Sequence, residues 1–254
     1  MKSPIKDVNR DFKSLSVLKN IIPKGSTIKS FLFFGGSIEF NLAEDNRFVS
    51  AHTTKYVIYE FWQCLLEDKR KVLEILNCDP FKFKDENIFG VLQENWAKYN
   101  DPFIRAALFF LLNRCSETGM ISSGKLDQKN FHPLALSYIK RFEPKNFHLT
   151  CDAPLDVLES IDKFSDVDFL LFPIGDFQYN LLEQGKSVGY ETEQINHRKL
   201  KKKLDEKKHK WILIYNYHSY VFELYKDYQI TMIDRFGRKT IKHDSCEEII
   251  VTNF

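Results

Sequence analysis

A short apolar run that ends abruptly is the feature that most constrains the fold of this chain. Residues 169–172, Phe-Leu-Leu-Phe, follow two acidic residues, and Pro173 and Gly175 come directly after the run. A continuous apolar run of this length predicts a strand of a parallel sheet that is buried on both faces, and the proline and glycine predict its end. In open α/β sheets, ligands bind beyond the carboxyl ends of such strands. We therefore expect the functional site of the chain close to this point.

The remaining sequence predicts short strands that alternate with helices. Further strands are expected at 28–34, 47–51, 147–151, 211–215, 230–234 and 248–251. Helices are expected at 11–22, 38–42, 56–66, 102–115, 134–141, 155–161, 191–210 and 221–227, and residues 69–99 are expected to be helical with a turn near Cys78-Asp79-Pro80. This alternation predicts an α/β fold with a mainly parallel, mixed sheet and a β-hairpin at the C-terminal end.

A glycine turn follows the first of these strands. Residues 28–34 lead into Gly35-Gly36-Ser37, and a helix is expected directly afterwards. A strand, a glycine turn and a helix in this order let the backbone approach a nucleotide-like ligand closely. The alternative is a tight turn that needs glycine only for its backbone angles. The turn alone leaves both interpretations open.

Composition restricts the class of protein. The 254 residues are 43% hydrophobic and carry a formal net charge of +2, so a full core can be buried and the chain as a whole is not strongly basic. The five cysteines are scattered and form no Cys-x-x-Cys pair, so neither a disulfide framework nor a metal site is expected. No run reaches the roughly 18 apolar residues of a membrane span. We expect a cytoplasmic protein; the 23 phenylalanines, with many lysines and asparagines, fit AT-rich coding and a viral source, which would place it in the host cytoplasm or the virion.

The segment 101–119 carries the most specific motif, Asp-Pro-Phe-Ile-Arg-Ala followed by Leu-Asn-Arg. It resembles the helix that begins the target-recognition region of Dam-like adenine-N6 DNA methyltransferases, and the order of the other motifs along the chain is also similar to that family. The resemblance implies a Rossmann-like methyltransferase fold that binds S-adenosylmethionine. Residues 1–79 and 146–254 would then form the methyltransferase-like α/β domain, and 80–145 a helical insertion that resembles the target-recognition region.

The chain departs from this family where the cofactor should bind. The resemblance assigns the cofactor pocket to Lys13, Phe34, Gly35, Gly36, Ser37 and His52. Asp11 and Phe12 replace two glycines before the lysine, and Phe34 replaces the first glycine of the turn, where a benzyl group should block a closely approaching ligand. His52 replaces the acid that binds ribose hydroxyls, and it cannot offer the two acceptor oxygens of a carboxylate. We therefore expect no bound cofactor.

The catalytic motif of the family is also changed. Its Asp-Pro-Pro-Tyr corresponds here to Phe172, Pro173, Ile174 and Gly175. Phe172 cannot accept a hydrogen bond from the amine of a flipped adenine, and Gly175 has no ring to stack on the base. These four positions are therefore expected to be degenerate and not catalytic. The alternative is that Asp176 or Asp168 supplies the carboxylate after a shift of register.

Nucleic-acid contacts would come from basic and amide side chains in two regions. The candidates are Arg105, Asn113, Arg114, Lys125, Arg198, Lys199, Lys201 and Lys202. The lysine-rich run 197–210 could bind phosphates, and the alternative is a solvated helix face. The arginine that follows the recognition helix in the family is missing, so base-specific readout by a bidentate guanidinium is not supported.

Three functions are compatible with these patterns. The first is a catalytically inactive methyltransferase homologue, or pseudoenzyme, kept as a binding or scaffolding protein for DNA, for another protein or for further copies of itself. The second is an active adenine-N6 DNA methyltransferase with a divergent site, for which S-adenosylmethionine would be the cofactor. The third is a structural component of a viral particle. We expect neither a metal nor a membrane as a partner.

Overall fold

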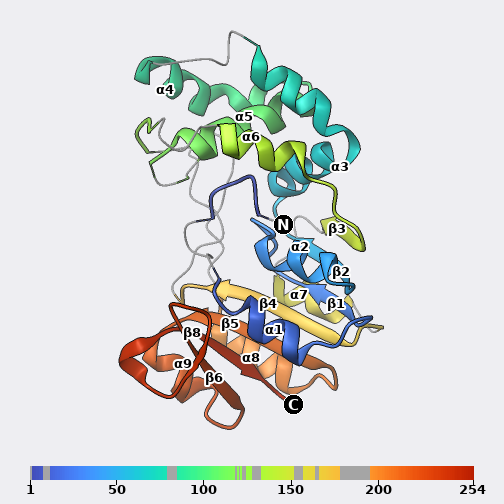
Figure 1. Cartoon of the computed structure of the whole chain (residues 1–254), viewed down its shortest axis with the longest axis vertical. Coiled ribbons are helices and arrows are strands. Elements are labelled where there is room, and N and C mark those ends of the chain that lie inside the picture. Colours follow the sequence, from blue (N-terminus) through green and yellow to red (C-terminus); the bar gives the residue numbers. More distant parts are fainter. Residues whose placement is uncertain are drawn as a thin grey trace. The chain divides into compact units, whose positions relative to one another are not determined.

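The computed structural model describes residues 2–7, 12–78, 85–117, 119, 121, 124–127, 133–151, 157–163, 166–177 and 195–254 (Figure 1). By their internal contacts these residues form two compact units, an α/β unit within 12–55, 144–177 and 195–254 and a helical unit within 2–7 and 56–143. The interpretation of 80–145 as an insertion that resembles a target-recognition region stays a prediction.

The α/β unit is built on a single mixed sheet. In the described part of the chain its strands are β1 (Thr27–Ser30), β2 (Phe48–Thr53), β3 (Phe147–Cys151), β4 (Phe169–Gly175), β5 (Lys210–Asn216), β6 (Gln229–Asp234), β7 (Lys239–Thr240) and β8 (Cys246–Thr252). They lie in the order β3-β2-β1-β4-β5-β8-β6-β7. The first five are parallel, in the Rossmann order, and β8 runs antiparallel between β5 and β6. This is the Rossmann-like α/β fold with a mainly parallel, mixed sheet that we expect from the sequence.

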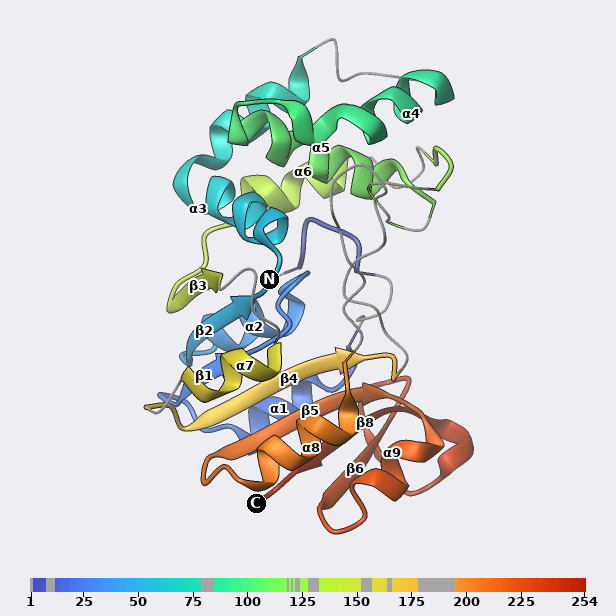
Figure 2. The same ribbon diagram turned by 180° about the vertical axis from the view of Figure 1, so that it is seen from behind.

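Helices cover both faces of this sheet. The helices are α1 (Leu15–Ile21), α2 (Ser37–Glu44), α7 (Val157–Ser160), α8 (His197–Asp205) and α9 (Ser219–Leu224), with short 3-10 turns η4 (Ile161–Lys163) and η5 (His243–Ser245). α1 and α2 lie on one face, and α7, α8 and α9 lie on the other (Figures 1 and 2). Strand β5 shows why the sheet holds both layers: Ile212 packs with α1 and α2, while Trp211 and Leu213 pack with α8.

The predicted end of the central strand is wrong. β4 does not stop before Pro173 but continues through it to Gly175, paired with β5 along its whole length and with a register shift near the proline. The carbonyl of Leu171 accepts the N–H of Phe31 at 2.9 Å, so this side of Leu171 faces the segment that contains β1. Backbone groups two residues apart in a strand point to the same side, so the nitrogen of Pro173 also faces that segment. β1 ends at Ser30, so no strand needs an N–H there, and the proline is tolerated.

The first strand is shorter than predicted. The sequence predicts a strand over 28–34, whereas β1 ends at Ser30. Leu32 has a φ of 59°, in the left-handed region, which turns the chain out of the sheet. The following residues, including Phe33, are therefore part of the loop that leads to α2.

The helical unit consists of α3 (Tyr56–Asn77), α4 (Glu86–Asn95), η2 (Trp96–Lys98), α5 (Pro102–Cys115) and α6 (Pro133–Lys140). Asp101 caps α5, because its carboxylate accepts the N–H of Phe103 at 2.8 Å. Buried rings join the helices: Phe61 of α3 lies 5.0 Å from Phe109 of α5. No helix of the described residues is both long enough and apolar enough to cross a membrane.

Candidate functional site

The glycine turn and the predicted catalytic stretch lie at the same edge of the sheet. β1 and β4 are adjacent and parallel, so the loops that follow them start side by side. The rings of Phe31 and Phe172 are stacked there, with centroids 4.7 Å apart and planes at 9°. The two segments therefore lie side by side. We call this the carboxyl edge.

At the glycine turn, the space beside the backbone is filled by a phenylalanine. Gly36 precedes α2 and has a φ of 70°, which favours glycine. A Cβ atom at Gly36 would lie 2.2 Å from the ring of Phe40, which is itself fully buried. Phe33 packs against that ring edge to face, 5.9 Å away. Gly35 is buried, and Phe34 and Ser37 are half-buried.

His52 lies at the end of β2 and is fully buried. Its ring is 5.7 Å from that of Phe31, and its carbonyl accepts the N–H of Phe33 at 3.0 Å. The imidazole is thus part of the aromatic packing between β1 and β2. It presents no surface to solvent at the position where the resemblance places a ribose-binding acid.

The four predicted catalytic positions lie inside the strand and not in the loop beyond it. Phe172 and Ile174 are fully buried in the core that packs on α8, and Pro173 and Gly175 are buried too. The first residue after the strand is Asp176. Its carboxylate accepts a hydrogen bond from the side-chain amide of Asn216, the last residue of β5.

Asp168 cannot act at this edge. It precedes β4 and therefore lies at the opposite, amino edge of the sheet. Its carboxylate accepts the N–H of Thr27 at 2.7 Å and the hydroxyl at 2.9 Å, and these bonds hold the pKa of Asp168 below its usual value. Of the two acids that could replace the catalytic carboxylate, only Asp176 is at the carboxyl edge.

Beyond β4 lies a cluster of aromatic and histidine side chains that sequence patterns do not indicate. Phe177 stacks on His197, at 4.0 Å, and on His218, at 4.5 Å. Phe177 lies in a loop, His197 in α8 and His218 at the N-cap of α9. Because each segment contributes one ring, the cluster has no sequence spacing by which it could be predicted.

A chain of hydrogen bonds runs from this cluster into the core. The Nε2 of His197 lies 2.7 Å from the carbonyl of Phe177, so this nitrogen carries the proton and donates. The other ring nitrogen then accepts from the hydroxyl of Tyr215 at 3.0 Å, and Tyr225 donates to Tyr215 at 3.2 Å. Burial lowers the pKa of His197 and raises the pKa of Tyr215 well above its usual value. The chain therefore holds neutral groups.

The N-terminal segment with Lys13 is tied to the last strand. The backbone N–H groups of Lys13 and Ser14 donate hydrogen bonds to the carboxylate of Glu248 in β8, and the bond from Ser14 is 2.9 Å long. Burial is the main cause that raises the pKa of Glu248, and these two N–H groups oppose it. Phe12 packs beside α1, and Asp11 lies outside the described residues. The backbone hydrogen bond to Glu248 thus fixes the position of Lys13.

In the helical unit, Arg105 makes internal contacts. Its guanidinium forms a two-pronged ion pair with Glu60 of α3, with Nε 2.8 Å from one carboxylate oxygen. It also donates to the carbonyls of Tyr99 and Asn100, the second at 3.0 Å. The described contacts of Arg105 therefore join α5 to α3 and to the loop that precedes α5.

Asn113 and Arg114 hold the N-terminal residues of the chain. Asn113 is fully buried; its side chain accepts the N–H of Lys6 at 2.6 Å and donates to the carbonyl of Lys6 at 3.0 Å. Arg114 donates to the carbonyls of Pro4 and Ser3. These contacts join residues more than one hundred positions apart. The described side-chain contacts of Asn113 and Arg114 are thus internal, and a nucleic-acid contact of this motif stays a prediction.

The remaining basic candidates lie on the surface. Lys125, Lys199 and Lys202 are exposed. Arg198 is also exposed and donates to the hydroxyl of Tyr220 at 2.8 Å, and Lys201 forms an ion pair with Asp205 at 2.8 Å. Among the described residues no group of three or more His, Cys, Asp or Glu side chains could hold a metal ion.

Comparisons with known proteins give distant structural similarity. Neither a family model nor a curated protein sequence matches the chain. A TehB-like SAM-dependent methyltransferase from Corynebacterium glutamicum has a TM-score of 0.41 and 8% identity, over 97% of this chain and 88% of that one. A predicted O-methyltransferase from Agrobacterium tumefaciens has a TM-score of 0.37 and 9% identity, over 94% and 78%. Similarities this distant transfer neither a substrate nor an activity.

Proposed function

We propose that the chain is a methyltransferase-fold protein that does not bind S-adenosylmethionine and acts as a binding or scaffolding protein for DNA or a protein partner. The observation that carries this proposal is the ring of Phe40 in front of Gly36. In a nucleotide-binding turn the missing Cβ leaves room for the ligand. Here a buried ring takes that room, and Phe33 packs against it. Interiors are packed too tightly for such a ring to move aside freely.

Two further positions support the loss of the cofactor. His52, at the end of β2, is enclosed by the protein and lacks the paired acceptor oxygens that hold ribose hydroxyls. Phe34 is half-buried where the family has a glycine. Together with Phe40, these side chains do not fit S-adenosylmethionine, and we derive no methyl transfer through it.

For the partner, the proposal favours DNA contacts on α8. Lys199 and Lys202 point their charges to solvent, whereas Lys203 and Lys207 are both paired with Asp162. Exposed lysines that are not neutralised contribute to phosphate binding through release of counterions. A structural role in a virus particle has no specific residue behind it and is not proposed.

The binding part of the proposal can be tested with labelled duplex DNA. We expect the double variant Lys199→Ala/Lys202→Ala to weaken binding and to lower the slope of log affinity against log salt by about 2. The matched control is Lys203→Ala/Lys207→Ala, which removes the same number of charges from the same surface but from residues paired with Asp162. Equal loss in both variants would contradict a contact through the unpaired lysines.

A second candidate, an active adenine-N6 methyltransferase, is favoured by Asp176. Its carboxylate is at the carboxyl end of β4, oriented by Asn216, and could accept hydrogen bonds from an exocyclic amine. Against it, Phe177, the next residue, already stacks on His197 and His218 and is not free to stack on a base. The candidate therefore has a carboxylate but lacks the ring.

Tritium transfer from labelled S-adenosylmethionine to duplex and single-stranded DNA separates the two candidates. The proposed function predicts no incorporation above background, because each lost positioned group costs about 3–4 kcal/mol of barrier, or roughly two to three decades in rate. Incorporation by the unmodified chain that Asp176→Asn abolishes and Asp168→Asn leaves unchanged would establish the second candidate. Asp168 is the matched control since it lies at the other end of the same strand.

A further inference from the structure

An open groove lies at the edge of the sheet opposite to the candidate site. Its volume is about 620 Å³. It is lined by Pro23, Lys24, Gly25, Ser26, Val167, Asp168, Phe169, Lys208, His209 and Lys210. These residues precede or begin β1, β4 and β5, so the groove is at the amino edge, and we call it the amino-edge groove. Nothing in the proposed function uses it.

The lining of this groove is positively charged. Three lysines, Lys24, Lys208 and Lys210, line the groove together with a single acidic residue, Asp168. The carboxylate already accepts two hydrogen bonds from Thr27. The groove therefore has a surplus of positive charge.

Lys210 is positioned by aromatic rings. Its ammonium lies 5.6 Å from the ring centroid of Phe169 and 5.4 Å from that of Phe254. The two rings are 5.6 Å apart and meet at an angle of 65°. Contacts of this kind hold a cation without neutralising its charge. The ammonium therefore keeps its full charge for a ligand.

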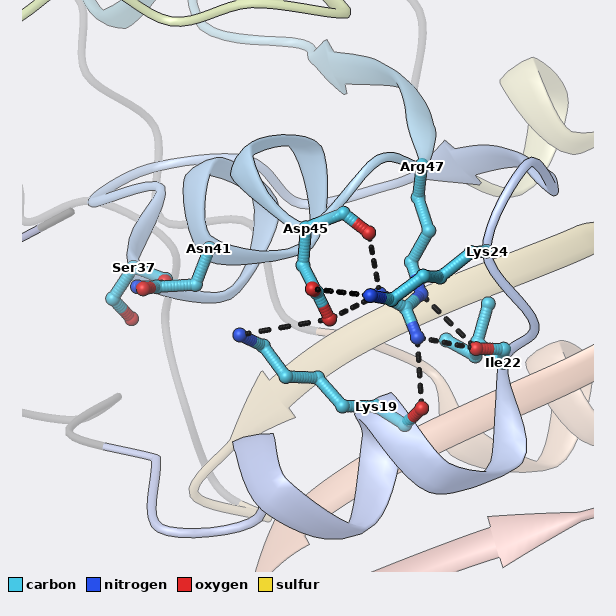
Figure 3. A network of polar contacts seen from close by, with 7 residues as sticks. All are labelled: Lys19, Ile22, Lys24, Ser37, Asn41, Asp45 and Arg47. Carbon is cyan, nitrogen blue, oxygen red and sulfur yellow. Dashed lines mark hydrogen bonds and ion pairs between the residues drawn. The ribbon is translucent and has the colours of Figure 1, made fainter.

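The opposite wall of the groove is fixed by a buried arginine. The guanidinium of Arg47 donates to the carbonyls of Ile22, at 3.0 Å from Nε, and Lys19, at 2.7 Å (Figure 3). The N–H of Gly25 donates to the carbonyl of Asn46 at 2.7 Å. These bonds hold both ends of the loop that carries Lys24, so the wall is organised before any ligand arrives.

The same network leaves Lys24 only partly neutralised. One carboxylate, Asp45, serves three cations: it is 2.6 Å from Arg47, 3.5 Å from Lys24 and 3.8 Å from Lys19 (Figure 3). Arg47 is the nearest of these and is buried. The side chain of Lys24 is 66% exposed and can therefore turn to an anion in the groove.

We propose that the amino-edge groove binds a compact, multiply charged phosphate compound of nucleotide size. Lys208 and Lys210, with Lys24 within reach on its exposed side chain, match the charge of a di- or triphosphate, and the volume of about 620 Å³ lies in the range of small-molecule sites, about 300–1,000 Å³. A long nucleic acid fits this groove less well, because the lysines that precede Lys208 in the chain, Lys203 and Lys207, are both paired with Asp162. The inference does not depend on the proposed function.

Calorimetry on the full chain with ATP, inorganic triphosphate and adenosine tests this site. ATP and triphosphate should both bind with one-to-one stoichiometry, and adenosine should not. Raising the salt from about 50 mM to about 500 mM should weaken binding, since exposed charges are screened. The double variant Lys208→Ala/Lys210→Ala should lower the affinity by at least about tenfold.

The matched control is Lys239→Ala/Lys242→Ala, which removes two exposed lysines from the same unit at the edge hairpin. Equal weakening in both double variants would show unspecific attraction and would overturn the proposal. So would adenosine binding as tightly as ATP, or binding of a short single-stranded oligonucleotide without binding of ATP. Lys208→Gln provides the same test should the double variant fail to fold.

Discussion

The two edges of one sheet differ in what fills them. At the carboxyl edge, the ring of Phe172 near the end of β4 and the rings of Phe31 and Phe40, which follow β1 in the chain, are fully buried. At the amino edge, β1, β4 and β5 begin beside an open groove that is lined by Lys208 and Lys210. Ligands of open α/β sheets are expected at the carboxyl edge. The strand order is shared by both edges, so the difference comes from the side chains at and around the two ends of the strands.

The largest expected effect is the loss of stability when the buried Arg47, whose hydrogen bonds organise the amino edge, is replaced. Arg47→Ala should lower the free energy of unfolding by about 3–5 kcal/mol, because it leaves the carbonyls of Ile22 and Lys19 without their charged, buried donor. Urea unfolding measures the change. Lys19→Ala is the control and should change stability by less than about 1 kcal/mol. A loss below about 1 kcal/mol for Arg47→Ala would mean that the network does not organise the groove.

A pair of glycines compares the two edges directly. Gly25 and Gly36 both have positive φ, at 83° and 70°, so alanine strains the backbone at either position. A Cβ meets nothing within 4 Å at Gly25 but would lie 2.2 Å from Phe40 at Gly36. We predict a loss of about 1 kcal/mol for Gly25→Ala and about 2–4 kcal/mol for Gly36→Ala. Similar losses, measured by thermal or urea unfolding, would show that the space at Gly36 is not filled.

A smaller effect is expected from pH. The folded state lowers the pKa of His197, so its contribution to stability is present above the unfolded pKa of about 6.5 and is lost as the pH falls below it. The free energy of unfolding should therefore fall from pH 7 to pH 5, with at most about 1.4 kcal/mol per pH unit from this group. His197→Gln should flatten the profile, whereas His148→Gln, at an exposed position in β3, should not. Identical profiles for the two variants would contradict the assignment.

The local parts of the fold could be predicted from sequence. The strand at 169 and the cap at Asp101 depend on neighbouring residues, and the structure has both. The end of β4 could not be predicted, because Pro173 is tolerated only where its neighbouring strand has already ended. That condition involves a residue far away in the chain, in the turn at Leu32.

The candidate sites depend even more on distant contacts. Asn113 belongs to a motif that resembles a recognition helix, and the sequence does not indicate that its side chain binds the backbone of Lys6. The amino-edge groove combines Lys24, Asp168 and Lys208 from three segments, none of which forms a motif by itself. The sequence shows that the glycine turn departs from the family it resembles. It does not show that the ring of Phe40 fills the space beside Gly36.

The most direct test is calorimetry of the full chain with S-adenosylmethionine, with thermal unfolding measured in parallel. We predict no heat beyond dilution and no shift of the unfolding midpoint, because Phe40 takes the space beside Gly36. A saturable one-to-one isotherm, with a stabilisation that rises with ligand concentration and is lost in Gly36→Ala, would show that the cofactor enters the glycine turn and would contradict the proposed function.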